Sequence, residues 1–170
     1  TGMLVKSKVN FSNLLDQVMP KINDVLSNQG ENHKLTEFVS RYIHFQNILD
    51  MGEMKFTSDY CKWAKKKGYR LNERKAAEIL ALAQNGIPTL PNSQSVKIAV
   101  SEAVKLIHSI EESRNTILAQ MQDLCNTLPE YSVVKEMDCI GDTLAPRIIA
   151  EIGDVRRFKN KHSLIAYAGI

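Results

Sequence analysis

The sequence lacks the patterns on which secreted and membrane proteins depend. Its three cysteines are an odd number without a C-x-x-C pair, which argues against a disulfide scaffold and favours a reducing, cytosolic compartment. No apolar run approaches the roughly 18 residues that a membrane-spanning helix needs. The N-terminus has no uninterrupted apolar signal core. No membrane partner is therefore expected.

Motifs of catalysis are also missing. There is no glycine-rich phosphate loop, no G-x-S-x-G, and no histidine pair at the helical spacing of a zinc site. The four histidines are scattered, and the three thiols are interpreted as packing residues or as incidental. We therefore predict no catalytic residue, no metal ligand and no cofactor for this stretch.

What is present favours helices. Hydrophobic residues make up 44% of the 170 positions, aromatic residues only 6%, and β-branched alternation is rare. These features predict an all-α fold class with a substantial core. The net charge of +3 is modest, so a polyanionic partner has to be argued from local clusters of cations.

Apolar spacing and capping residues predict the first helices and loops. The first unit of structure is expected to be a helical subdomain, residues 1–91. Its helices are predicted over residues 3–19, 21–26, 35–49 with Gly52 as the stop, 58–67 with Ser58 as N-cap, and 72–85 between Asn72 and Gly86, with a polar loop at Ser27–Asn32.

A long helix is predicted over residues 92–128, after a proline-containing connector, with Ser93 or Ser95 as its cap. Its apolar positions alternate steps of four and three, a 3.5-residue period that is typical of a coiled coil, and a length of roughly 45 to 50 Å is expected. The alternative is an intramolecular helical bundle. The seam predicted to mediate dimerisation comprises Val96, Val100, Ala103, Ile107, Ile110, Arg114, Ile117, Met121, Leu124 and Leu128.

A dense group of cations lies between the expected helices of the first subdomain. It is interleaved with Trp63 and Tyr69 and contains one acid, Glu73. Such a patch could hold phosphates, although a lysine run is more often a solvated helix face, and Trp63 is better interpreted as a packing residue. The candidate nucleic-acid-binding residues here are Lys62, Lys65, Lys66, Lys67, Arg70, Arg74 and Lys75.

Residues 128–153 predict two short helices around a tight turn. Ser132 is the expected cap of the first, Asp142 or Thr143 that of the second, and Gly153 the stop. The pattern resembles a helix-hairpin-helix through Met137, Ile140, Gly141 and Ala145, a motif that points backbone N–H groups at a phosphate. Gly141, Thr143 and Arg147 are candidate contacts. Cys139 stands where the motif has glycine, and an ordinary hairpin that binds nothing is the alternative.

Four further cations follow the hairpin. Arg156, Arg157, Lys159 and Lys161 are expected on a loop that has no acid after Asp154. Clustered cations without compensating acids favour a phosphate-facing surface.

Residues 130–170, together with residues 69–88 and 117–134, resemble the insertion-sequence one-ten family of DEDD-type transposases (IS110, IS116 and IS902 type), which are RNA-guided DNA recombinases. The family's P-G-I-G is similar to Asp138-Cys139-Ile140-Gly141 here. The resemblance implies that this chain is an internal fragment, with residues 129–170 as the start of a C-terminal transposase domain. It also implies that a divalent metal such as Mg²⁺ belongs to a catalytic domain carried elsewhere.

The function expected is therefore part of a DNA transposase acting in DNA transposition and recombination in the bacterial cytoplasm. This fragment is expected to supply dimerisation and nucleic-acid binding, and to be inactive by itself. DNA is the expected partner, guide RNA is a further one implied by the resemblance, and a homodimer or higher homo-oligomer is expected. The alternative is a pure oligomerisation or scaffold module without nucleic-acid binding.

Overall fold

The computed structural model describes residues 2–27, 33–70 and 72–169, and these residues form helices, turns and loops without any strand. The predicted all-α fold class is confirmed. The polar loop expected at Ser27–Asn32 lies, beyond Ser27, outside the described residues.

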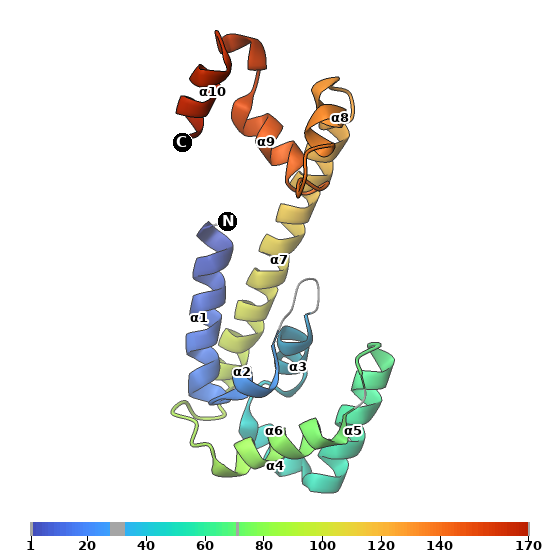
Figure 1. Cartoon of the computed structure of the whole chain (residues 1–170). Coiled ribbons are helices and arrows are strands. Elements are labelled where there is room, and N and C mark those ends of the chain that lie inside the picture. The colour runs from blue at the N-terminus through green and yellow to red at the C-terminus, as the bar shows by residue number, and fades with distance from the viewer. Residues whose placement is uncertain (1, 28–32, 71, 170) are drawn as a thin grey trace. The chain divides into compact units, whose positions relative to one another are not determined.

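The chain separates into two compact units, which are described one at a time (Figure 1). The N-terminal unit is Thr1–Glu111 and the C-terminal unit is Glu112–Ile170, so that the boundary falls inside one long helix, Gln94–Cys125 (α7). The predicted domain boundaries at 91 and 128 stay a prediction.

The described residues of the N-terminal unit form six helices and the first part of α7. The helices are α1 (Gly2–Val18), α2 (Ile22–Val25), α3 (Lys34–Tyr42), α4 (Phe45–Met51), α5 (Glu53–Lys66) and α6 (Glu73–Asn85). Helix α6 contacts α2, α4 and α5. An ion pair of 2.7 Å between Lys8 on α1 and Glu111 joins α1 to α7.

One helix predicted over residues 35–49 is wrong, because the chain breaks into α3 and α4. Ile43 has a φ of 64°, and His44 is extended and caps α4 by accepting from the Gln46 N–H at 3.0 Å. Since Nδ1 of His44 is the acceptor, Nε2 carries the proton and donates to the Leu90 carbonyl at 3.0 Å. A buried histidine with partners on both sides therefore fixes the break.

One other helix start differs from expectation, and one agrees with it. Helix α5 begins at Glu53, directly after Gly52, and Ser58 lies inside it instead of capping it. Helix α7 begins at Gln94, and Ser93 Oγ accepts from the Val96 N–H at 3.4 Å, so Ser93 is the residue that caps it. Gly52 explains the early start of α5, because its φ of 76° lets one helix end and the next begin without a loop.

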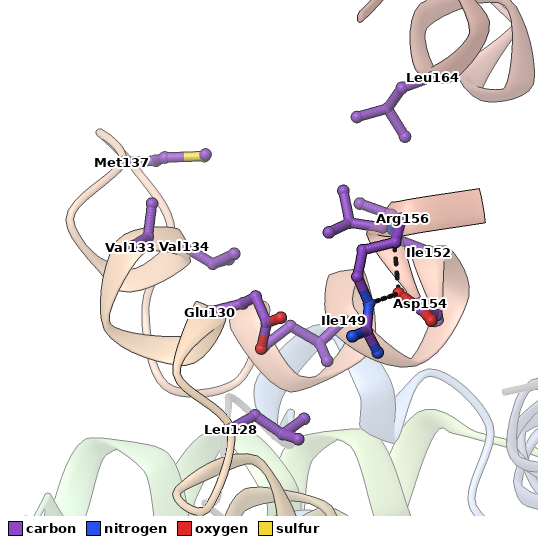
Figure 2. Close-up of a pocket in the computed structure, with 12 residues that line it drawn as sticks. Leu128, Glu130, Val133, Val134, Met137, Ile149, Ile152, Asp154, Arg156 and Leu164 are labelled. Carbon is purple, nitrogen blue, oxygen red and sulfur yellow. Dashed lines mark hydrogen bonds and ion pairs between the residues drawn. The ribbon is translucent and has the colours of Figure 1, made fainter. Parts of the chain in front are cut away.

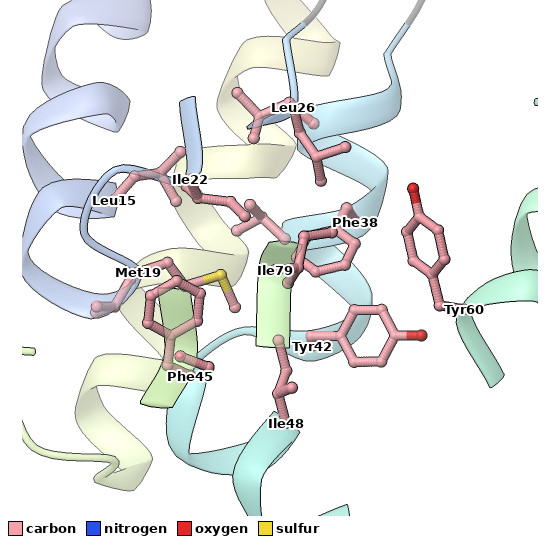
Figure 3. Close-up of a cluster of buried hydrophobic side chains, with 14 of the residues drawn as sticks. Leu15, Met19, Ile22, Leu26, Phe38, Tyr42, Phe45, Ile48, Tyr60 and Ile79 are labelled. Atoms are coloured by element: carbon pink, nitrogen blue, oxygen red, sulfur yellow. The ribbon is translucent and has the colours of Figure 1, made fainter. Parts of the chain in front are cut away.

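The core of the N-terminal unit is rich in aromatic side chains (Figure 3). Phe38 is fully buried, and its ring lies 4.6 Å from that of Tyr42 and 6.0 Å from that of Trp63, measured between centroids. Such tilted and edge-on contacts add to the free energy of burial. Trp63 is 7% exposed and packs as predicted, so it offers no surface for stacking a base.

The C-terminal unit consists of the end of α7, three short helices and a 3₁₀ turn: α8 (Glu130–Lys135), α9 (Ala145–Ile152), η1 (Val155–Arg157) and α10 (Lys161–Ala168). Its described core is small: Cys125, Tyr131 and Ala145 are buried there. The predicted cap at Ser132 is wrong, because α8 has already begun at Glu130. The predicted start of α9 near Asp142 is also wrong, because the helix begins at Ala145.

Candidate nucleic-acid interface

Arg156 and the acid before it form a closed local pair at η1. Asp154 Oδ1 accepts from the Arg156 backbone N–H and from its Nε, each at 2.9 Å. These hydrogen bonds hold the pKa of the Asp154 carboxyl below its ordinary value and raise the pKa of the Arg156 guanidinium. Arg156 is thus paired with an acid of its own segment, while both side chains remain exposed to solvent.

The neighbouring Arg157 is held differently. Its guanidinium carbon lies 4.7 Å from the ring centroid of Phe158 and 4.7 Å from that of Tyr167, while the two rings are 5.4 Å apart. The Tyr167 hydroxyl donates to the Glu151 carbonyl at 3.3 Å, which ties α10 to the end of α9. We call Arg157, Phe158 and Tyr167 the arginine-aromatic cluster.

Lys159 and Lys161 lie beside this cluster in sequence and are exposed. Between them, the Asn160 side chain accepts from the Ser163 N–H at 3.0 Å and caps α10. The expectation that all four cations lie on a loop is therefore wrong in part, since Arg156 and Arg157 belong to η1 and Lys161 opens α10.

The turn of the hairpin takes an unexpected conformation. Cys139 has a φ of 67°, so it adopts the conformation expected of the glycine that it replaces, whereas Gly141 does not have a positive φ. A Cβ added to Gly141 would meet no atom within 4 Å, so this glycine faces open space. Thr143 and Arg147 are exposed beside it.

The backbone N–H groups at the start of α9 are partly used inside the turn. Both Leu144 and Ala145 donate to the Gly141 carbonyl at 3.0 Å, and Pro146 has no N–H. Lys135 on α8 closes the hairpin through an ion pair of 2.6 Å to Asp142. These contacts leave fewer donors for a phosphate than a helix start ordinarily offers. The helix-hairpin-helix assignment stays a prediction.

An apolar groove of about 670 Å³ opens between α8, α9 and η1 (Figure 2). Val134 and Met137 come from α8 and the residues after it, and Ile149 and Ile152 come from α9. Glu130 and the Asp154–Arg156 pair supply its charged groups. The groove is consistent with the small core of this unit, because the apolar faces of short helices that pack loosely remain open to solvent.

In the N-terminal unit the predicted cation patch is divided among different roles. Lys67 Nζ is ion-paired with Glu37 at 2.9 Å, and Lys75 Nζ donates to the Val25 carbonyl at 2.6 Å, so both stabilise the fold. Tyr69 is tied to the same carboxylate, Glu37, through its hydroxyl at 3.0 Å. The exposed members of the patch that remain on the helix surface or beside it are Lys62, Lys65, Lys66, Arg70 and Arg74.

The predicted seam of α7 changes character along its length. Val100 and Ile107 are 0% and 1% exposed and belong to the core of the N-terminal unit, with Val96 and Ala103 packed against it. These side chains are not available to a second copy. Further along, Ile110 and Met121 are half-buried and Arg114 is exposed. Ile117, Leu124 and Leu128 are 56%, 70% and 41% exposed.

Sequence reasoning missed Phe158 and Tyr167. The signal was present, because an aromatic residue follows directly on Arg157 in a basic segment, but the second ring is ten positions away and its approach depends on the turn between η1 and α10.

Among the described residues, no group of three or more His, Cys, Asp or Glu side chains is arranged to hold a metal ion. None of the described helices is long and apolar enough to cross a membrane.

The fold and surface thus define an all-α chain with a long helix and a C-terminal end that carries exposed cations. Residues 131–170, which include that end, match the model of the Transposase IS116/IS110/IS902 family. A relative, the insertion element IS110 uncharacterized 43.6 kDa protein of Streptomyces coelicolor, is 22% identical over 157 residues, which are 92% of this chain and 38% of the relative. The chain thus spans well under half of that protein. No solved structure matches.

These two matches confirm the family resemblance that the sequence indicated: this chain is similar to IS110-family transposases, and most directly so over residues 131–170.

Proposed function

We propose that this chain is a segment of a bacterial, cytoplasmic DNA transposase, acting in DNA transposition and recombination, and that it binds nucleic acid and dimerises without carrying out catalysis. The observation that carries the proposal is that the transposase match covers residues 131–170, the same stretch that exposes Arg157, Lys159 and Lys161. Cations on one surface without an acid for each favour a phosphate backbone.

Binding to duplex DNA and to a structured RNA, titrated with salt, tests this part of the proposal. Each phosphate contact contributes about 0.9 to the slope of log K against log salt for duplex DNA, so several contacts give a steep dependence. A steep slope with duplex DNA supports DNA as the direct partner, and a steep slope with RNA alone supports the guide RNA. Binding that does not respond to salt, or no binding at physiological salt, favours the scaffold alternative.

The exposed apolar side chains in the second half of α7 favour dimerisation. Ile117 and Leu124 are seven residues apart on α7, which keeps both on one helical stripe with the spacing of a coiled-coil seam, and Leu128 lies just beyond the end of the helix. Large apolar side chains that line up on an exposed helix face usually meet a partner.

Mass in solution, measured over a range of concentrations, tests the dimer. Substituting aspartate at Ile117 and Leu124 should convert it to a monomer, whereas Thr116→Asp, at an exposed polar position of the same helix, should leave the mass unchanged. A wild-type chain that is monomeric at the highest concentration would contradict this part of the proposal.

The catalytic acids and their Mg²⁺ are proposed to belong to other parts of the full-length transposase.

A further inference from the structure

We propose that Arg157 is a pre-positioned phosphate clamp, held by the rings of Phe158 and Tyr167, and that it contributes more to nucleic-acid affinity than the adjacent Arg156. The inference rests on the proposed function, because it names the residue and geometry through which this surface would grip a phosphodiester. It separates two neighbouring arginines that look equivalent in the sequence.

The aromatic rings beside Arg157 leave its hydrogen-bond donors available. A guanidinium is planar, and its N–H donors lie in the plane, so an aromatic ring against its face leaves those donors available at the edge. The Phe158 and Tyr167 ring centroids each lie 4.7 Å from the Arg157 guanidinium carbon and 5.4 Å from each other, so both rings are on one side of this carbon and its other side stays open. The edge that remains matches two oxygens of a phosphate, which is the bidentate arrangement that arginine makes best.

The neighbouring rings restrict the motion of the Arg157 side chain. A long, free arginine side chain loses rotamer entropy when it is immobilised on a ligand, and a side chain already confined by neighbours loses less. Tyr167 is itself fixed, because its hydroxyl donates to the Glu151 carbonyl. Arg157 nevertheless remains exposed, as a group that meets a backbone must.

Arg156 and Arg157 differ in whether an acid lies beside the guanidinium. Arg156 already has a carboxylate at 2.9 Å from its Nε, so Asp154 engages that donor and its negative charge opposes the approach of a phosphate to the same guanidinium. The rings beside Arg157 attract its cation without neutralising it. Lys159 and Lys161 add cations to the same short segment, which raises the local attraction for a polyanion.

The test compares Arg157→Gln with Arg156→Gln in the whole 170-residue chain, using duplex DNA of arbitrary sequence and a structured RNA as the two probes. We expect Arg157→Gln to weaken binding to the preferred probe about five- to tenfold. If that probe is duplex DNA, the same variant should also lower the salt slope by about 0.9. Arg156→Gln should change the affinity less than about twofold. Arg157→Lys keeps the charge but loses the planar fork, so it should recover only part of the affinity. Circular dichroism confirms that each variant keeps its helices.

A second pair of variants tests whether the ring acts through the arginine. Tyr167→Leu should weaken binding in the wild-type background and have no further effect when Arg157 is already glutamine. Equal losses from the two arginine variants, or wild-type affinity in Arg157→Gln while the parent chain still binds with a steep salt slope, would overturn the clamp and leave the proposed function standing. Absence of salt-dependent binding by the parent chain would overturn both.

Discussion

Replacing Cys139 by glycine should stabilise the hairpin turn. The φ of 67° at this position is one that a side chain with a Cβ adopts at a cost of roughly 1–2 kcal/mol, which glycine does not incur. Glycine in turn gives the unfolded chain more freedom, which offsets roughly 0.5–1 kcal/mol of the gain. The Cys139 side chain is exposed and free, so its removal sacrifices little packing. The net expectation is a stabilisation of about 0.5–1 kcal/mol.

Hydrogen exchange of the turn amides is the appropriate assay, because a chain of two units need not unfold in one transition. The Leu144 and Ala145 amides, which both donate to the Gly141 carbonyl, report on the turn. A gain of about 0.5–1 kcal/mol corresponds to exchange slowed about two- to fivefold. Cys139→Ala is the matched control, since it removes the sulfur but keeps the Cβ. Equal protection in the glycine and alanine variants would refute the explanation from backbone strain.

Three further predictions concern other positions. Gly86→Ala should destabilise the N-terminal unit by about 1–3 kcal/mol in urea unfolding, because the new Cβ would lie 2.7 Å from a backbone carbonyl oxygen. Gly141→Ala should leave stability unchanged and weaken nucleic-acid binding only if a phosphate backbone approaches that glycine closely. The hydrogen bond from Arg41 is the main cause of the lowered pKa of the Asp59 carboxyl. The ionised carboxylate therefore stabilises the fold above the ordinary carboxyl pKa, and this stabilisation is lost as the pH falls through the pKa that Asp59 has in the folded state. The stability of Asp59→Asn should therefore change less than that of wild type on acidification below about pH 4.

The helices that the sequence predicts well are those whose limits are set locally. Helix α6 begins after Asn72 and ends before Gly86, where these residue types predict its limits, although the Asn72 side chain accepts no capping hydrogen bond, and the start of α7 follows from Ser93. The break between α3 and α4 could not be predicted in this way. It depends on the hydrogen bond from His44 to Leu90, whose carbonyl is 46 positions further along the chain. Apolar periodicity continues through Ile43 regardless of that contact.

The candidate site was predictable in position but not in detail. Clustered cations identify residues 156–161 from composition alone, since few acids interrupt them. Arg156 and Arg157 differ in their contact partners. Arg156 is paired with Asp154, whereas Arg157 lies against the rings of Phe158 and Tyr167. In the N-terminal unit the same limit applies to Lys67 and Lys75, whose partners at Glu37 and Val25 lie 30 and 50 positions away.

The seam of α7 shows why periodicity alone leaves the assembly state open. An apolar stripe of period 3.5 packs equally well against a partner chain or against helices of its own chain, and here Val100 and Ile107 do the latter. The exposed half offers Ile117 and Leu124, and Leu128 follows just after the helix ends at Cys125. Covering three side chains that are already partly buried contributes roughly 1–2 kcal/mol each, or about 6–12 kcal/mol for two copies. Association costs about 4–15 kcal/mol in lost freedom, so the balance is close to zero. Any dimer made by this surface alone should therefore be weak and dissociate on dilution. A mass that stays dimeric down to nanomolar concentration would require an additional interface.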